Sequence, residues 1–187
     1  MPVVKRWTAR EVRQLIADSP LATPRYELVD GELLVTPSPN LLHQRAVKLL
    51  LLALHEYLDA GTIGDAINSP FDVELEPESI VQPDVFVLPM HEVRRLRTAM
   101  PARELLVAAE VLSPSSGRYD RVKKRPHYQR HVGEYWIVDL DARLIERWRP
   151  GDARPEVLTQ LLTWLPQGAE SPFALDLPRY FAKVLDD

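Results

Sequence analysis

The longest regular pattern of apolar and polar residues in this chain has a helical period. Between residue 41 and about residue 58, apolar side chains recur at positions 42, 46, 49, 50, 53, 54 and 57. This spacing places them on one wide stripe of a helix. Asn40 directly precedes the pattern and is suited to cap it. We therefore predict a long helix that contributes much of the core.

Shorter apolar runs predict strands. Residues 25–29 and 32–35 flank the pair Asp30-Gly31, which favours a β-hairpin because Asp-Gly readily adopts positive φ. A second hairpin is predicted for residues 134–140 and 144–148. The remaining runs are aliphatic or β-branched and are separated by proline, glycine and charged residues; they comprise residues 71–75, 81–88, 105–112 and a segment near 157–162.

Three further helices complete the predicted elements. Thr8 and Glu11 have the spacing of a capping box and predict a short N-terminal helix. Residues 119–131 predict a helix that Pro126 disturbs, and a last helix is expected from Pro178. Helices and strands alternate without an internal repeat or linker, so we expect one mixed α/β (α+β) domain spanning residues 1–187.

Composition narrows the class of protein. The 187 residues include no cysteine, which excludes disulfides, thiolate metal sites and cysteine nucleophiles, so a metal would need oxygen or histidine ligands. The N-terminus lacks the apolar core of a signal peptide. The longest apolar run, residues 47–54, is too short to span a bilayer. We expect a cytoplasmic protein that does not act at a membrane.

Charge is unevenly distributed along the chain. The net charge is −4, yet residues 94–130 contain ten basic and three acidic side chains. Such a basic segment can bind a phosphate backbone by releasing counterions, but a solvated helix face has the same composition. The basic residues are Arg94, Arg95, Arg97, Arg103, Arg118, Arg121, Lys123, Lys124, Arg125 and Arg130.

Two acidic residues occupy the ends of predicted strands. Asp84 follows Pro83 near the start of one apolar run, and Glu110 lies late in the next. Neighbouring strands are about 4.8 Å apart, so they could bring both carboxylates to one divalent cation. Without a metal, the two carboxylates would repel each other and the pKa of one would rise. The structural alternatives are a strand-start turn at Asp84 and an arginine partner for Glu110.

Lys124 adds a positive charge to this hypothesis. It lies four residues after Asp120 and four before Tyr128, so the three share one face of the predicted helix. From this face the lysine could reach Glu110 and stabilise charge that develops on a phosphate; the alternative is a solvated surface lysine. Asp84, Glu110 and Lys124 together suggest metal-dependent cleavage of a phosphodiester.

Several short motifs follow one another between about residues 25 and 140. They are Tyr-Glu-Leu-Val-Asp-Gly-Glu-Leu at 26–33, Pro-Ser-Pro at 37–39, His-Gln at 43–44, Gln-Pro-Asp-Val at 82–85, Glu-Val-Leu-Ser-Pro-Ser at 110–115 and Gly-Glu-Tyr-Trp-Ile-Val-Asp at 133–139. The single residues Asp120, Lys124 and Tyr128 complete the set. Their order resembles the Uma2 family of bacterial proteins, which is similar to the PD-(D/E)XK nuclease superfamily. The resemblance implies a restriction-endonuclease-like core, a mixed central β-sheet flanked by helices, here with an N-terminal helix and β-hairpin.

The resemblance also implies roles for particular residues. Asp84 and Glu110 correspond to the acidic residues of the superfamily motif, and the main-chain carbonyl of Val111 would be a further metal ligand. The lysine expected two residues after Glu110 is replaced by Leu112, so we expect Lys124 to supply its charge. In this hypothesis Mg²⁺ or Mn²⁺ lowers the pKa of a bound water and attracts a phosphate oxygen, while Lys124 orients the water.

Four other polar residues are auxiliary candidates. Hairpin register decides whether Glu27 or Glu32 faces the site, and we take Glu32 as the auxiliary acid. His43 could contact substrate or cap the long helix against the sheet. Gln82 could orient a ligand or satisfy a strand edge. Tyr128 joins them because it shares the helix face described above.

Two functions are compatible with the sequence. The first is a Mg²⁺-dependent endonuclease that hydrolyses DNA, with the nucleic acid as partner and a dimer or higher homo-oligomer as its form, as in the similar nucleases. The second is a nuclease-like protein that binds nucleic acid or serves in assembly without cutting, which Leu112 favours. A Ser/His hydrolase is disfavoured because the chain contains no Gly-x-Ser-x-Gly motif.

Overall fold

A six-stranded mixed sheet forms the centre of the computed structural model, which describes residues 5–19, 21, 24–59, 62–97, 101–113 and 117–186. Among the described strands, β5 and β6 are parallel and the other neighbours in this sheet are antiparallel. The strand order is β3 (Gly64–Asn68), β4 (Val85–Pro89), β5 (Leu105–Val111), β6 (Val132–Asp139), β7 (Leu144–Trp148) and β8 (Glu156–Leu158). The expected mixed α/β class is therefore confirmed.

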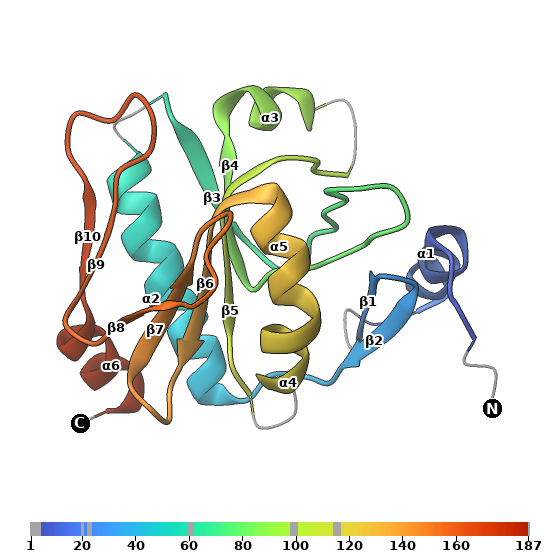
Figure 1. The fold of residues 1–187 in the computed structure, drawn as a ribbon, viewed down its shortest axis with the longest axis horizontal. Coiled ribbons are helices and arrows are strands. Elements are labelled where there is room, and N and C mark those ends of the chain that lie inside the picture. Colours follow the sequence, from blue (N-terminus) through green and yellow to red (C-terminus); the bar gives the residue numbers. More distant parts are fainter. Residues whose placement is uncertain are drawn as a thin grey trace.

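Helices cover both faces of this sheet (Figure 1). Successive strand residues point to opposite faces, so alternate positions of β4 and β5 separate two cores. The core on the side of α2 (Leu41–Leu58) contains Leu50, Leu54, Val85, Val87, Val107 and Ala109. The core on the side of α5 (Arg125–His131) contains Phe86, Leu88, Ala108 and Tyr128. Burial on both faces explains why the central strands are continuous apolar runs.

The N-terminal elements confirm the predicted helix and hairpin. Helix α1 (Ala9–Asp18) begins with the capping box of Thr8 and Glu11. The hairpin of β1 (Arg25–Val29) and β2 (Glu32–Thr36) turns at Asp30-Gly31, where φ is 51° and 77°. These elements lie at the end of the molecule opposite the C-terminal helix α6 (Leu177–Leu185) (Figure 1).

The parallel strands β5 and β6 require a crossover, and helical residues supply it. These are α4 (Gly117–Tyr119), the π-helical turn η1 (Asp120–Lys124) and α5. The helix predicted for residues 119–131 is confirmed, with a change of register before Pro126. Proline lacks the amide N–H that would continue an α-helix, and a wider turn precedes it, closed by the Arg125 amide donating to the Asp120 carbonyl.

Several predicted boundaries are wrong. Residues 71–75 form no strand, and Val73 makes only isolated bridges to Val81 and Ala102. The strand predicted from residue 81 begins at Val85, because Pro83 cannot donate a ladder hydrogen bond. The segment near 157–162 divides between β8 and β9 (Leu161–Trp164), and β9 pairs with β10 (Phe173–Asp176) in a separate sheet.

Three elements were not predicted from the sequence, and one of them is β10, described above. Strand β3 has the largely polar sequence Gly-Asp-Ala-Ile-Asn and pairs with β4 as an edge strand. Helix α3 (Met90–Arg95) is short and directly follows β4. Neither segment has a long apolar period, so pattern alone gives a weak signal.

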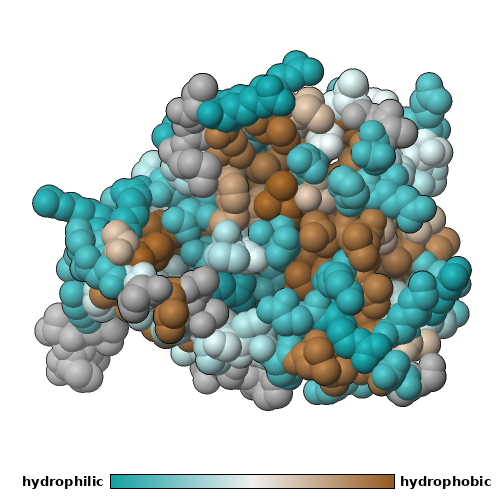
Figure 2. Space-filling view, turned by 180° about the vertical axis from the view of Figure 1, so that it is seen from behind, coloured by the Kyte–Doolittle hydropathy of each residue, from teal (hydrophilic) through white to brown (hydrophobic). Residues whose placement is uncertain are grey.

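The outer surface carries scattered apolar side chains. Figure 2 shows them among polar residues on the face that lies behind in Figure 1. Leu41, Leu42 and Leu52 of α2 are among the exposed apolar residues. Within the described part of the chain, no helix has both the length and the apolar character that crossing a bilayer demands.

Candidate functional site

Asp84 and Glu110 meet because β4 pairs with β5. In this antiparallel register Val85 lies opposite Ala109, so Asp84 and Glu110, the next positions outward, also face each other. Alternation along the strands directs both side chains to the face that α5 covers. Both residues are almost fully buried, with 4% and 2% of their surface exposed. The predicted meeting of these carboxylates at one end of two neighbouring strands is confirmed.

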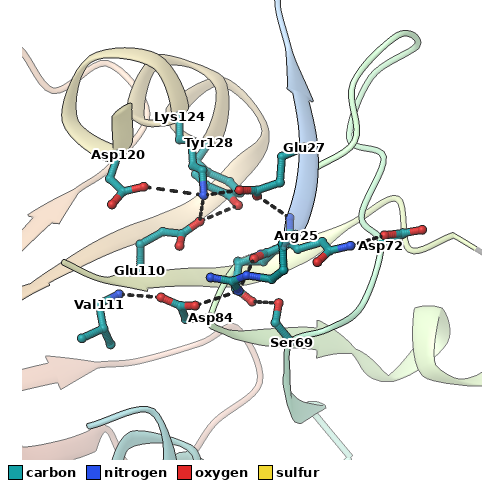
Figure 3. A network of polar contacts seen from close by, with 12 residues as sticks. Arg25, Glu27, Ser69, Asp72, Asp84, Glu110, Val111, Asp120, Lys124 and Tyr128 are labelled. Carbon is teal, nitrogen blue, oxygen red and sulfur yellow. Dashed lines mark hydrogen bonds and ion pairs between the residues drawn. The ribbon is translucent and has the colours of Figure 1, made fainter. Parts of the chain in front are cut away.

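Three donors surround the Asp84 carboxylate, and Figure 3 shows two of them, Arg25 and Val111. The Arg25 guanidinium donates to Oδ1 at 2.9 Å, while His43 Nε2 and the Val111 amide lie 3.0 Å from Oδ2. Burial alone would raise the pKa of Asp84. The contact with His43, the charge of Arg25 and the Val111 amide outweigh burial and hold this pKa well below its ordinary value. Asp84 is therefore ionised at neutral pH.

Glu110 has a different electrostatic environment. Its Oε1 accepts from the Lys124 ammonium at 3.0 Å and from the Tyr128 hydroxyl at 3.1 Å. Burial raises the pKa of Glu110 well above its ordinary value; Lys124 opposes this rise, and the charge of Asp84 adds to it. The sequence predicted that repulsion would raise the pKa of one carboxyl group; Glu110 is the one whose pKa rises, and burial contributes more to this rise than the charge of Asp84.

Lys124 lies at the centre of a group of buried carboxylates. Its ammonium is 2.7 Å from Glu27, 3.0 Å from Glu110 and 3.6 Å from Asp120 (Figure 3). Burial lowers the pKa of Lys124, but the three negative neighbours outweigh burial and raise it well above its ordinary value. The lysine is thus a buried permanent cation, and the alternative of a solvated surface side chain is wrong.

We refer to Arg25, Glu27, Asp84, Glu110, Asp120 and Lys124 as the carboxylate cluster. A cavity of about 280 Å³ opens onto it, so a small ligand has access to these side chains. The cavity is lined by Arg25, Thr36, Pro37, Ser38, Pro39, Asn40, His43, Asp84, Glu110, Val111, Ser113, Asp120 and Lys124.

The auxiliary residues are placed in different ways. His43 lines the cavity, and the Tyr128 hydroxyl contacts Glu110. The Gln82 side chain donates to Asp72 at 2.7 Å and does not line the cavity. Glu32 pairs with Lys123 at 2.6 Å in a half-exposed contact.

Hairpin register does not separate the two glutamates, because Glu32 pairs with Val29, which shares the face of Glu27. Their depth separates them, since Glu32 lies beside the turn with its side chain 43% exposed. Glu27 is fully buried on β1, and its Oε1 accepts from the Gln82 amide at 2.7 Å. Val111 lines the cavity, and its amide donates to Asp84. Metal coordination by the Val111 carbonyl stays a prediction.

Sequence reasoning gave no role to Arg25 or Asp120. Arg25 and Glu27 are two positions apart on β1, so strand alternation places both on one face. A basic and an acidic residue at this spacing were the available signal that Arg25 lies near the site. Asp120 was recognised as sharing a helix face with Lys124, but its burial depends on the packing of η1 against the sheet.

Many side chains of the basic segment have acidic partners. Lys124 lies within the carboxylate cluster, Arg121 pairs with Asp139 and Glu146, and Arg95 pairs with Glu92. These contacts reduce the positive charge that the segment presents to solvent, so the count of basic residues overstates the basic surface.

The carboxylate cluster has the ligand chemistry of a divalent-cation site, although among the described residues no three of its carboxylates bring ligand atoms within 4.8 Å of one another. Four buried carboxylates, those of Glu27, Asp84, Glu110 and Asp120, contact the two permanently charged cations Arg25 and Lys124. His43 adds positive charge only when it is protonated. With Glu110 ionised, as it would be when a metal binds, the excess of negative charge equals the charge of one divalent ion, and clustered carboxylate oxygens are the ligands that Mg²⁺ prefers.

Comparison with solved structures supports the architecture. A crystal structure from Anabaena variabilis, titled as "a putative nuclease belonging to DUF820", superposes with a TM-score of 0.75 at 19% sequence identity. The match covers 90% of this chain and 96% of that one. This likeness confirms the expected nuclease-like fold.

Comparison with protein families assigns the chain. No protein of curated function matches it. The Uma2 model, described as "Putative restriction endonuclease", matches residues 11–178. Because this match extends over most of the sequence, the chain belongs to the Uma2 family.

Proposed function

We propose that this protein is an endonuclease that hydrolyses phosphodiester bonds of DNA with Mg²⁺ or Mn²⁺ as its cofactor. The family and the nuclease-like fold support a nuclease. The observation that carries the proposal is the carboxylate cluster, in which the negative charge of four buried acids exceeds that of their two permanent cations beside an open cavity. A DNA phosphate could enter this cavity and share the cation.

The cation would be held by Asp84 and Glu110, whose carboxylates face each other across β4 and β5, with the Val111 carbonyl as a further ligand. When bound, the divalent ion supplies a Lewis acid that activates water and polarises the phosphate. Asp84 enters this role already ionised, because His43 and Arg25 lower its pKa. Glu110 would lose its proton as the ion binds.

Lys124 replaces the lysine that the superfamily motif places at the position of Leu112. Leu112 is partly buried against the core on the side of α5, whereas the Lys124 ammonium reaches Glu110 from the crossover between β5 and β6. Because a charge acts through its position in space, Lys124 can stabilise negative charge that develops on the phosphate. The Tyr128 hydroxyl contacts the same Glu110 oxygen and holds that carboxylate in place.

Arg25 and His43 would act on the substrate side of the cluster. Both contact Asp84 and line the cavity. Arg25 would exchange its contact with Asp84 for a phosphate oxygen when the cation binds, since a guanidinium matches phosphate geometry. His43 would orient water or phosphate next to Asp84.

A second candidate function is nucleic-acid binding or assembly without cleavage. Lys124 already forms ion pairs with three carboxylates, which favours this second candidate, because a lysine fixed in a buried ion cluster can serve stability alone. Metal binding with no cleavage would support this candidate.

A plasmid nicking assay separates the two functions. Purified protein is incubated with supercoiled DNA and Mg²⁺, with a chelator as control. We expect nicking by the natural protein, and a loss of about two to three orders of magnitude in Asp84→Asn, because a metal site contributes several kcal/mol to the transition state. Circular dichroism verifies folding of the variant. Equal cleavage by Asp84→Asn would refute the assignment.

A further inference from the structure

A second group of possible metal ligands lies outside the carboxylate cluster. Glu76, His127 and His131 each offer one ligand atom, and these three atoms lie within 4.8 Å of one another. Among the described residues, no other group of three or more acidic or histidine side chains brings its ligand atoms this close together. We refer to these three residues as the histidine cluster.

Helix geometry brings the two imidazoles together. His127 and His131 are four residues apart on α5, so they lie one turn apart on the same face. Glu76 comes from the segment between β3 and β4. His127 Nδ1 lies 3.0 Å from Glu76 Oε1, and His131 Nε2 lies 3.1 Å from Oε2. One carboxylate thus faces two imidazole nitrogens, one on each oxygen.

These distances are close to those of a metal coordination shell. Zinc binds imidazole nitrogen and carboxylate oxygen at about 2.0–2.1 Å, and tetrahedral angles then place neighbouring ligand atoms roughly 3.3 Å apart. The observed separations of 3.0 and 3.1 Å involve the two different oxygens of Glu76, and one ligand atom from each of the three residues lies within 4.8 Å of the others, so these atoms need to close by at most about 1.5 Å around one ion. A cation could therefore enter with small side-chain movements.

Burial suits the residues to this role. The His127 side chain is fully buried, and its ring packs against those of Tyr128 and His131, so the direction of Nδ1 is fixed. His131 and Glu76 remain partly exposed, which leaves a route for the ion and for a water ligand.

One neighbouring cation must be accommodated. Arg130 Nη2 lies 3.5 Å from Glu76 Oε1 and 3.9 Å from Asp30. The Arg130 side chain is half exposed, so it can keep Asp30 as partner while a metal ion takes Glu76. The competing interpretation of the histidine cluster is a simple ion pair between Glu76 and a protonated histidine.

We propose that Glu76, His127 and His131 bind Zn²⁺, or a divalent cation of similar ligand preference, with water as the fourth ligand. Two imidazoles and one carboxylate are borderline ligands that favour zinc over magnesium. The ion would connect α5 to the segment between β3 and β4, which is held to its surroundings by isolated bridges rather than by a strand ladder. The site is therefore a structural clamp distinct from the carboxylate cluster.

Calorimetric titration of the full chain with Zn²⁺ tests this proposal. The variant Asp84→Asn is titrated in parallel, because the carboxylate cluster could also take zinc. We expect Asp84→Asn to keep one zinc site, and His131→Gln in that background to weaken it by about tenfold or more, since ligand changes have effects of at least this size. His91→Gln is the matched control, because His91 also pairs with a glutamate but is mostly exposed.

The imidazole nitrogen resonances provide a readout that needs no substitution. Zinc should shift His127 Nδ1 and His131 Nε2 and leave His55 and His91 nearly unchanged, whereas His43 contacts Asp84 and would report zinc in the carboxylate cluster. This measurement decides the question even if His131→Gln does not fold. The proposal is overturned if Asp84→Asn binds no zinc, if His131→Gln in the Asp84→Asn background binds it with unchanged affinity, or if zinc shifts neither of these nitrogens.

Discussion

The carboxylate cluster and the histidine cluster both depend on the crossover between β5 and β6, yet they offer a cation different surroundings. The first contributes carboxylate oxygens that are at most 4% exposed, together with a buried lysine. The second contributes two imidazoles and one partly exposed carboxylate. Hard oxygen ligands favour Mg²⁺, whereas borderline nitrogen ligands favour Zn²⁺. Neighbouring residues of one helical segment can therefore contribute to two sites that favour different cations.

The largest expected effect comes from removing the buried cation of the carboxylate cluster. Lys124→Ala leaves three buried carboxylates without their common partner, and loss of one member of a buried ion pair costs about 3–5 kcal/mol. Urea denaturation in chelated buffer measures the free energy of unfolding. Lys123→Ala is the matched control. Lys123 makes one half-exposed pair, with Glu32, so its removal should hardly change the free energy of unfolding. Equal losses in the two variants would show that Lys124 is not the electrostatic centre.

Mg²⁺ should stabilise the folded protein through the carboxylate cluster. A ligand at about 100 times its dissociation constant contributes about 2.7 kcal/mol. Glu110→Gln removes one proposed ligand and should abolish most of the rise in melting temperature on adding Mg²⁺. The rise on adding Zn²⁺ should persist in this variant, because the histidine cluster is intact. Retention of the full Mg²⁺ effect in Glu110→Gln would place the ion elsewhere.

Glu110 of the carboxylate cluster and Glu76 of the histidine cluster should give stability opposite dependences on pH. Burial raises the folded-state pKa of Glu110, so in metal-free protein its contribution to stability falls as pH rises above about 4.5, the ordinary glutamate value. At Glu76, burial is outweighed by His127 and His131, which lower the pKa, so its contribution is lost as pH falls below that value.

Denaturation across a pH series checks these signs. Glu110→Gln should flatten the profile above pH 4.5, and Glu76→Gln should flatten it below. If both variants flattened the same side of the profile, the electrostatic contrast between the clusters would be wrong.

The smallest expected effect concerns the auxiliary acid suggested by the sequence. Glu32→Gln removes a half-exposed pair with Lys123, and such pairs contribute little to stability. We expect an unchanged denaturation midpoint and unchanged plasmid nicking. A strong loss of nicking would instead support the original assignment of Glu32 to the active site.

The sequence predicted most of the features that depend on local pattern. The capping box at Thr8, the Asn40 cap and the Asp30-Gly31 turn are short-range signals, and the structure contains all three. The strands that carry Asp84 and Glu110 were also recognised from their apolar composition. The facing of these two acids was expected without a choice between parallel and antiparallel pairing, and it is antiparallel.

Features that depend on packing could not be predicted. The selection of Glu27 over Glu32 required the orientation of the hairpin against the segment before β4, which is fixed by the bridge between Leu28 and Ile80. Arg25 gave no signal of its own until the structure placed it on Asp84. Likewise, Glu76 is distant in sequence from His127 and His131, and only the folded chain brings them together.

The most direct test of the central claim is a crystal structure of the protein grown with Mn²⁺ and measured at the manganese absorption edge. We predict an anomalous peak bonded to the carboxylates of Asp84 and Glu110, with the Lys124 ammonium close by. A peak elsewhere, with no manganese between these two carboxylates, would contradict the proposed metal-dependent nuclease site.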